Sequence, residues 1–155
     1  MIHTGPSPLS RPTFRVLESN PYLLVRYDPA LRLALFTRRP VPYPDMNTLH
    51  WAFDRILASY ASINRAEHRI IVDTRGAPPR NDEAFESAMS VLRPATLDGF
   101  ARIVFLVRTV VGKLQIGRHA QSDGMTVFIS ADLAEIGSEL GIRLDDAVMA
   151  DPGAK

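Results

Sequence analysis

Short apolar runs alternate with segments of helical periodicity along most of this chain, and this alternation restricts its fold more than any other feature. Three such runs are HRIIVDTR (His68–Arg75), ARIVFLVR (Ala101–Arg108) and MTVFIS (Met125–Ser130). The first is apolar without alternation, which is typical of a strand buried on both faces. Because helical segments separate these strands, we expect them to run parallel and to be joined by right-handed crossovers.

An antiparallel hairpin is expected before them. YLLVRYD (Tyr22–Asp28) and LRLALFTR (Leu31–Arg38) both have the composition of strands, and only Pro29 and Ala30 connect them. A connection this short joins neighbouring antiparallel strands.

Four segments have helical character, and the clearest begins after Asp45, which is a start signal. Its apolar residues recur at the spacing of one buried stripe: Leu49, Ala52, Phe53, Ile56, Leu57 and Tyr60.

The other three helices have recognisable caps. Asn81 or Asp82 is expected to cap the second helix, and Ser130 the fourth. Gly124 and Gly141 are expected to end the third and the fourth. The apolar residues that the second helix turns inward are Phe85, Ala88, Met89 and Leu92.

Together these elements predict an α/β fold of order β-β-α-β-α-β-α-β-α, with a five-stranded, mostly parallel sheet. The strands are expected in sequence order, with the antiparallel first strand at one edge. The length of 155 residues suits one domain, which we place at residues 21–144. Residues 1–20, rich in Pro, Ser and Thr, are expected to form a flexible N-terminal arm, and residues 145–155 a C-terminal tail.

Composition argues against several classes of protein. The formal charge is +1, from 18 basic and 17 acidic side chains, so no concentrated basic face suggests nucleic-acid binding. The chain has no cysteine, and therefore no disulfide, thiolate metal site or cysteine nucleophile. We find no apolar run long enough to span a bilayer and no signal-peptide pattern, so we expect a cytoplasmic protein without membrane insertion.

Asp73, near the end of HRIIVDTR, is the first candidate for chemistry. A receiver domain would add an acidic pair after its first strand and a lysine after its fifth, where this chain has Asp28 alone and Ser130. A dehalogenase-type nucleophile would need an aspartate where Arg75 stands. We therefore interpret Asp73 as a carboxylate that accepts bonds from its own loop or pairs with an arginine, and expect no enzyme.

Metal and cofactor sites are not indicated either. None of the four histidines is spaced with another, or with a carboxylate, as metal ligands on a helix are. No glycine-rich phosphate loop follows a strand. We expect no metal and no cofactor.

Arginines gather in the sequence just after the strands, where parallel sheets bind ligands. The set is Arg38, Arg39, Arg75 and Arg108. A helix beginning near Thr109 adds unpaired N–H groups there. The set predicts a site for a phosphate or carboxylate on a nucleotide, a lipid headgroup or an acidic peptide. The alternative is that these arginines are solvated or pair with Asp73 and Asp82.

Trp51 lies about 200° around the helix axis from Leu49 and should face outward. An exposed tryptophan is often an anchor for a partner protein. Alternatively, the N-terminal arm covers it with Phe14 or Leu17.

Both faces of the predicted strands are largely apolar. In LRLALFTR, for example, Ala34 and Phe36 alternate with Leu33 and Leu35. If all helices pack on one face, the other needs a cover, which we expect to be the arm, a partner protein or a second copy of the chain.

The element order resembles that of the SpoIIAA-like fold, which includes the STAS domains of anti-sigma-factor antagonists and the CRAL-TRIO lipid-binding domains. The resemblance covers roughly residues 21–142, through the hairpin, RIIVDTRGAPPRNDEAFESAM, ARIVFLVRTVVGKLQIGRHAQSDG and MTVFISADLAEIGSEL. In antagonists of this family, a serine that begins the helix after the third strand is phosphorylated by a partner kinase. Asn81 and Asp82 stand there, so Asp82 is either a fixed negative charge or an ordinary N-cap.

The resemblance implies a non-enzymatic interaction module of a bacterial signalling system that docks a regulator, a kinase-like protein or its own copy as a homodimer. The residues expected to make the contacts are Arg75, Arg108, Trp51, Asp73, Arg38 and Asp82. The alternative is a sensor of a small anionic ligand, a lipid or a nucleotide, which requires an apolar cavity between helices and sheet. An enzyme centred on Asp73 is a third interpretation, which the missing partner residues disfavour.

Overall fold

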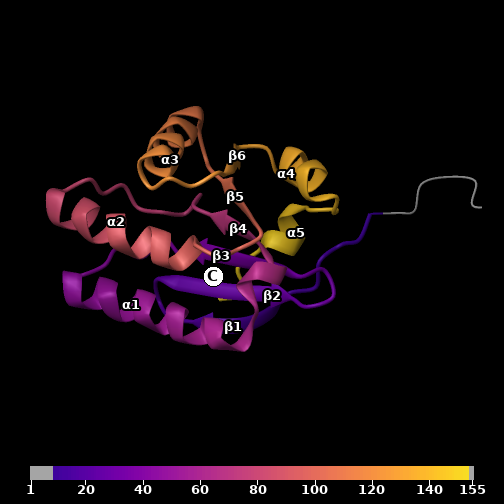
Figure 1. Ribbon diagram of the computed structural model, residues 1–155, viewed down its shortest axis with the longest axis horizontal. Coiled ribbons are helices and arrows are strands. Elements are labelled where there is room, and N and C mark those ends of the chain that lie inside the picture. Colours follow the sequence, from indigo (N-terminus) through magenta and orange to yellow (C-terminus); the bar gives the residue numbers. More distant parts are fainter. Residues whose placement is uncertain (1–8, 154–155) are drawn as a thin grey trace, which may run out of the picture.

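The computed structural model describes residues 9–153, and Figure 1 shows how its elements are arranged. The strands are β1 (Arg15–Ser19), β2 (Leu23–Asp28), β3 (Leu33–Arg38), β4 (Arg69–Asp73), β5 (Arg102–Leu106) and β6 (Phe128–Ser130). The helices are α1 (Met46–Ser59), α2 (Glu83–Leu97), α3 (Val110–Ser122), α4 (Leu133–Leu140) and α5 (Asp146–Met149), with short 3₁₀ helices η1 (Tyr60–Ser62) and η2 (Arg65–Glu67).

The six strands form one sheet in sequence order. β1, β2 and β3 are antiparallel neighbours, whereas β3 to β6 are parallel. The α/β class and the mostly parallel sheet in sequence order are thus confirmed.

The predicted count of five strands is wrong, because β1 lies in the segment interpreted as an arm. β1 is an edge strand with a bulge between Val16 and Glu18, and it is held mainly by backbone pairing with β2. Its residues are exposed or half-buried, so no buried run marks it in the sequence. The predicted edge strand, β2, is therefore second in the sheet. Residues 1–8 of the predicted arm lie outside the described residues.

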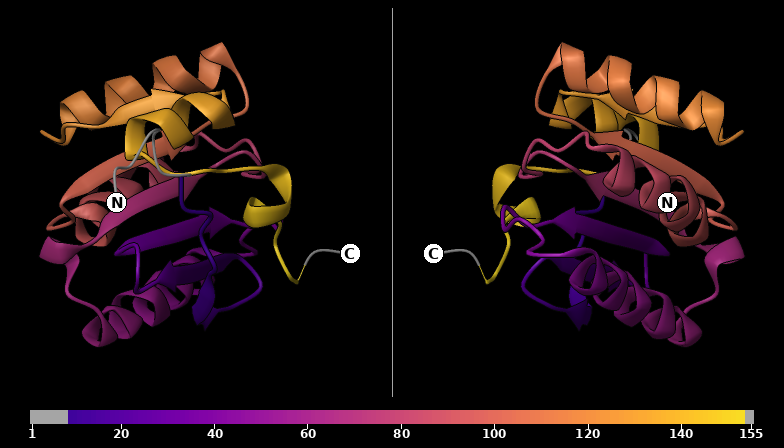
Figure 2. Two further views of the ribbon diagram at one scale, coloured as in Figure 1. Left: turned by 90° about the vertical axis from the view of Figure 1, so that its right-hand side faces the viewer. Right: turned by 90° about the vertical axis from the view of Figure 1, so that its left-hand side faces the viewer.

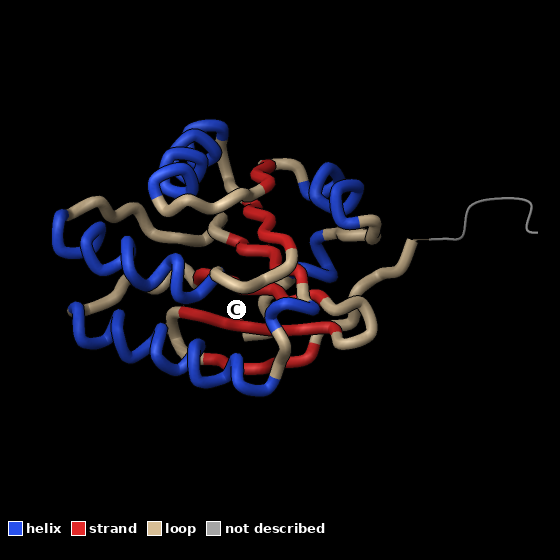
Figure 3. Tube along the Cα trace, in the orientation of Figure 1, coloured by secondary structure: helices blue, strands red, loops and turns tan. Residues whose placement is uncertain are grey.

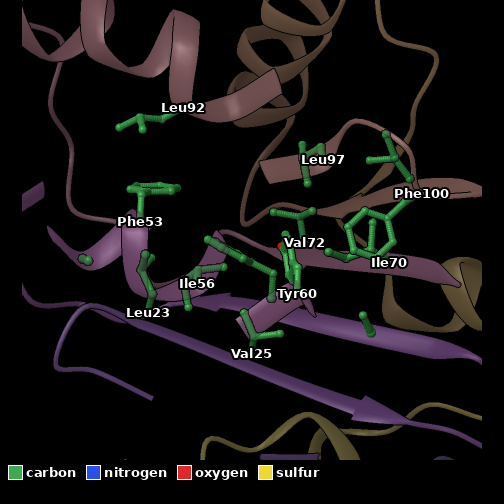
Figure 4. Packing of buried hydrophobic residues seen from close by; sticks show 14 of the residues in the cluster. Leu23, Val25, Phe53, Ile56, Tyr60, Ile70, Val72, Leu92, Leu97 and Phe100 are labelled. Atoms are coloured by element: carbon green, nitrogen blue, oxygen red, sulfur yellow. The ribbon is translucent and has the colours of Figure 1, made fainter. Parts of the chain in front are cut away.

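One face of the sheet carries α1, α2 and α3. Right-handed crossovers between successive parallel strands place all three connecting helices on the same side. Figure 4 shows Phe53 of α1 facing Leu92 of α2 in this core. Val25, Ile70 and Val72 of the strands belong to the same cluster.

The other face carries α4 and α5, which lie toward the viewer in the left-hand view of Figure 2. Figure 3 shows helices on both sides of the strands. Ile136, Leu140 and Met149 pack over strand residues such as Leu35 and Ile71. The expectation of a second face covered by a partner or a second copy is therefore wrong, and among residues 9–20 of the predicted arm only Phe14 belongs to this cluster. Because α4 follows the last strand, no crossover fixes its side.

The predicted C-terminal tail contains α5 and is held to the sheet. The buried guanidinium of Arg26 donates to the carbonyl oxygens of Met149 (3.2 Å) and Ala150 (2.8 Å). Arg39 donates from Nε and Nη2 to both carboxylate oxygens of Asp151. Residues 146–151 are thus part of the packed domain.

The predicted helix caps are mostly found. Asp45, Asp82 and Thr109 cap α1, α2 and α3, and each side chain accepts the N–H three residues further on. Ser130 is not the cap of the fourth helix, α4: Asp132 takes that role by accepting the N–H of Ala134. Gly141 ends α4 with a φ of 68°, and Gly124, which follows α3, has a φ of 70°. β6 is shorter than the predicted run MTVFIS and begins only at Phe128.

Candidate functional site

A cavity of about 760 Å³ opens at the carboxyl ends of β3, β4 and β5, beneath α1, α2 and α3. Its floor is apolar, because every second residue of these strands points to this side of the sheet. The main apolar side chains that line it are Phe36, Phe53, Val72, Met89, Phe105 and Ile116. We call this cavity the pocket; it is the kind of apolar space that the ligand-binding alternative requires.

The lining of the pocket carries more positive than negative charge. Four of its residues are arginines and one is a carboxylate: Arg38, Arg80, Arg93, Arg108 and Glu86. Arg80 pairs with Asp82 (2.6 Å) and Arg93 with Asp123 (3.0 Å). Within residues 9–153, Arg38 and Arg108 make no ion pair. An anion in the pocket would therefore meet uncompensated positive charge.

Arg38 is the more constrained of the two. Its Nη1 donates to the carbonyl oxygens of Tyr22 (3.3 Å), Arg39 and Val41 (2.9 Å). The guanidinium carbon lies 4.1 Å from the centre of the Tyr43 ring, in cation–π geometry. Burial lowers the pKa of Arg38 and raises the pKa of Tyr43 to about 12, so both side chains are held in partly dry surroundings.

The loop between β4 and α2 forms one wall of the pocket. Thr74, which lies beside Arg38 at the end of the next strand, donates from Oγ1 to the carbonyl of Leu106 (3.2 Å). A Cβ on Gly76 would lie 3.1 Å from the carbonyl oxygen of Arg38, so the loop passes close to β3. Asp82 ends the loop as the N-cap of α2 and is bound by Arg80, which lowers the pKa of Asp82.

The opposite wall is formed where α2 meets α3. His119 lies 3.7 Å from the Glu86 carboxylate, and both line the pocket. Burial is the main cause that lowers the pKa of His119, and the positive charge of Arg93 adds to it, whereas Glu86 opposes it.

Asp73 and Arg75 lie on the other side of the sheet, away from the pocket. Both carboxylate oxygens of the buried Asp73 accept bonds from Arg75, from Nε (3.0 Å) and Nη2 (2.9 Å). Asp73 also accepts the backbone N–H of Arg75 (3.1 Å). Asp146 of α5 contributes to the raised pKa of Arg75, which places the pair beneath the second layer of helices.

The structure therefore divides the predicted arginine set. Arg38 and Arg108 line the pocket, while Arg75 pairs with Asp73 and Arg39 with Asp151. A single anion site that uses all four is not formed, because alternate residues of a strand project to opposite faces.

Trp51 is exposed on α1, with 48% of its surface accessible, as its position relative to Leu49 predicts. Phe14 packs against the cluster on the opposite face of the sheet, whereas Leu17 of β1 packs against the cluster beneath α1, and Trp51 remains exposed. Trp51 is not among the residues that line the pocket.

Sequence reasoning missed several pocket residues, among them Tyr43, Glu86 and His119. Tyr43 lies in a Pro-rich connection without periodicity, and Glu86 and His119 come from different helices. The one signal in the sequence was the alternation of strand residues, which predicts that Arg38 and Arg39 face opposite sides of the sheet.

In the described part of the chain, no helix combines the length and apolar character needed to cross a membrane. Residues 9–153 also bring together no group of three or more His, Asp or Glu side chains that could hold a metal ion. Comparisons with protein-family models, with curated proteins and with solved structures found no match to this chain.

Proposed function

We propose that this chain is a non-enzymatic sensor of the SpoIIAA-like fold, active in the bacterial cytoplasm, that binds a small amphipathic anion in the pocket. The observation that carries the proposal is the cavity of about 760 Å³ with an apolar floor and an excess of arginine. Pockets for small ligands typically measure about 300–1,000 Å³ and combine apolar walls with a few polar groups.

The arrangement of these groups favours binding over catalysis. The carboxylate first considered for chemistry, Asp73, is neutralised by Arg75 on the other side of the sheet. The pocket itself offers apolar contact and positive charge, which suit a ligand with a hydrocarbon or aromatic body and one anionic group.

The test uses the dye 1-anilinonaphthalene-8-sulfonate, an aromatic anion whose emission rises on transfer from water to apolar surroundings. We expect one dye to bind per chain, and Met89→Trp, which fills the pocket from α2, to weaken binding at least tenfold. Val91→Trp is the matched control, because Val91 lies on the same helix but is 69% exposed and does not line the pocket.

Cooperative thermal unfolding of both variants must be shown, since this dye also binds partly folded states. Equal dye affinity in Met89→Trp and the unchanged protein would contradict the proposal.

A second candidate function, docking of a regulatory protein or of a second copy, is favoured by the exposure of Trp51. Trp51 is the sole tryptophan, so its emission reports on this surface alone. If the chain self-associates there, emission should shift to shorter wavelength as protein concentration rises. Trp51→Ala should then sediment as a monomer with an unchanged melting temperature, while Val91→Ala should still associate.

A large fall in the melting temperature of Trp51→Ala would instead make Trp51 a core residue. Monomeric sedimentation of the unchanged protein at all concentrations would exclude self-association and leave only a different protein as the partner.

A further inference from the structure

The arginines of this protein have a common way of binding carboxylates. Four of them donate from Nε and Nη2 to the two oxygens of one aspartate, in a fork-like, bidentate pair. The pairs are Arg11–Asp145, Arg39–Asp151, Arg75–Asp73 and Arg80–Asp82.

Arg38 is oriented in a different way. Its three bonds to carbonyl oxygens all come from Nη1, and the Tyr43 ring supports the plane of the guanidinium. Within residues 9–153, Nε and Nη2 of Arg38 form no hydrogen bond of normal geometry, although the neighbouring Tyr43 hydroxyl raises the pKa of Arg38 against the effect of burial. In the four pairs, the side of the guanidinium that carries Nε and Nη2 binds an aspartate. On Arg38 the same side is held in a fixed orientation, but no carboxylate of the described residues is paired with it.

The surroundings of Arg38 are partly dry. The side chain is partly buried, and burial lowers its pKa, with no carboxylate from the described part of the chain nearby to oppose that effect. An unpaired charge away from water is unfavourable, and a bound anion would relieve the cost. Arg108, by contrast, is exposed and can be solvated.

The position of Arg38 determines what else the ligand contacts. Arg38 follows Phe36 on the same side of β3, and both line the pocket. A group bound by Arg38 therefore has the apolar side chains of Phe36, Phe53 and Val72 next to it.

We infer that the ligand is a carboxylic acid with a hydrocarbon tail, and that Arg38 binds its carboxylate through Nε and Nη2 while the tail occupies the apolar floor. This inference rests on the proposed function and specifies its ligand class. Two parallel N–H donors match the two oxygens of a planar carboxylate, as the four internal pairs show.

The test compares octanoate with octanamide, which has the same tail and a neutral head, by isothermal titration calorimetry at pH 7. A charge-assisted bidentate pair is expected to make octanoate bind about 10- to 100-fold more tightly to the unchanged protein. Arg38→Gln should remove this preference and leave octanamide binding unchanged. Arg38→Lys keeps the positive charge but lacks the two paired donors, so the ratio of octanoate to octanamide affinity should fall to less than about one tenth of its value in the unchanged protein.

Arg118→Gln, which removes an exposed arginine of α3 outside the pocket, is the matched control and should keep the full preference. A preference that survives Arg38→Gln, or that Arg108→Gln removes instead, would overturn the inference. Equal affinity of the unchanged protein for octanoate and octanamide would also overturn the inference, but it would leave the proposed ligand-binding function of the pocket intact. If neither compound binds, the proposed function fails as well.

Arg38→Gln also loses the bonds from Nη1, so a second measurement needs no substitution. Octanoate labelled with ¹³C at the carboxyl carbon is titrated in complex with the unchanged protein. Contact with Arg38 should lower the pKa of the bound acid below that of free octanoic acid. An unchanged pKa in the complex would contradict the inference.

Discussion

Arg38 and Arg39 are neighbours in the chain, yet one lines the pocket and the other holds the C-terminal segment. Arg38 stacks on Tyr43 beside α1, whereas Arg39 forms a bidentate pair with Asp151 just after α5. The pleat of β3 and its extension explains the difference, because successive side chains project to opposite faces of the sheet. Substitution of the two residues should therefore have separable effects.

For Arg39, we expect an effect on stability that depends on pH. The bonds from Arg39 are the main cause that lowers the pKa of Asp151. Because the folded-state pKa is depressed, the stabilisation is full above the unfolded pKa of about 3.9 and is lost as the pH falls through the lower folded-state value. Arg39→Gln should lower the free energy of unfolding by about 1 kcal/mol at pH 7.

Urea denaturation of the unchanged protein and of Arg39→Gln at several pH values measures this difference in the free energy of unfolding. The two curves should approach each other as the pH falls through the folded-state pKa of Asp151, and any difference that remains reflects the bonds of Arg39 to Ser19 and Asn20. A difference that stays constant down to low pH would show that the ion pair with Asp151 is not its cause.

Asp73→Asn should reduce stability without affecting the pocket. The substitution removes the carboxylate that neutralises Arg75 and places an amide where two oxygens accepted bonds. Because Asp73 is buried and Arg75 is about one-third exposed, we expect a loss of about 1–3 kcal/mol in the free energy of unfolding. Binding of the dye should change less than twofold, and a large loss of binding with full stability would place Asp73 in the site.

His119 should give the protein a weak pH dependence between neutral and mildly acidic conditions. Its folded-state pKa lies below the unfolded value of about 6.5, so the unfolded chain takes up the proton first as the pH falls. The free energy of unfolding should therefore decrease below that pH, by less than about 1 kcal/mol because the ring is one-third exposed and solvent screens its charge. The groups that face it are Glu86 and Arg93 of α2, Arg118 of α3 and Asp123, which directly follows α3.

NMR titration of the ring and denaturation of His119→Gln test this. The variant should lose the slope, and His50→Gln, which removes an exposed histidine of α1, should keep it. A titration midpoint above 6.5 would reverse the sign and contradict the prediction.

Two glycines in helices should respond in opposite directions to alanine. A Cβ on Gly137 of α4 would lie 2.8 Å from the carbonyl oxygen of Ile142, so backbone must shift, and Gly137→Ala should cost about 1–3 kcal/mol. A Cβ on Gly117 of α3 would meet only the end of the Ile129 side chain, at 3.8 Å. Gly117→Ala should stabilise the protein by about 0.5–1 kcal/mol, because alanine favours helix. Thermal unfolding of the two variants compares them, and equal signs would contradict this prediction.

The sequence by itself determined most of the elements and their order, but not β1 or α5. The apolar stripe of α1, the caps at Asp45 and Asp82 and the continuous run of β4 are local patterns, and they predicted those elements correctly. Local periodicity reflects which side of an element is buried. It did not reveal β1, because β1 is held in the sheet by its backbone pairing with β2 and has no buried apolar run.

The tertiary structure decided which groups meet. Crossover handedness sets the side of α1, α2 and α3, but α4 follows the last strand and covers the second face through packing alone. Arg75 pairs with Asp73 only two residues away, which the sequence alone allowed. Packing of the layers, in contrast, carried Arg39 to Asp151 and left Arg38 with Tyr43 in the pocket. Such contacts join side chains from separate elements, so their distances depend on how the layers pack and not on the spacing of residues along the chain.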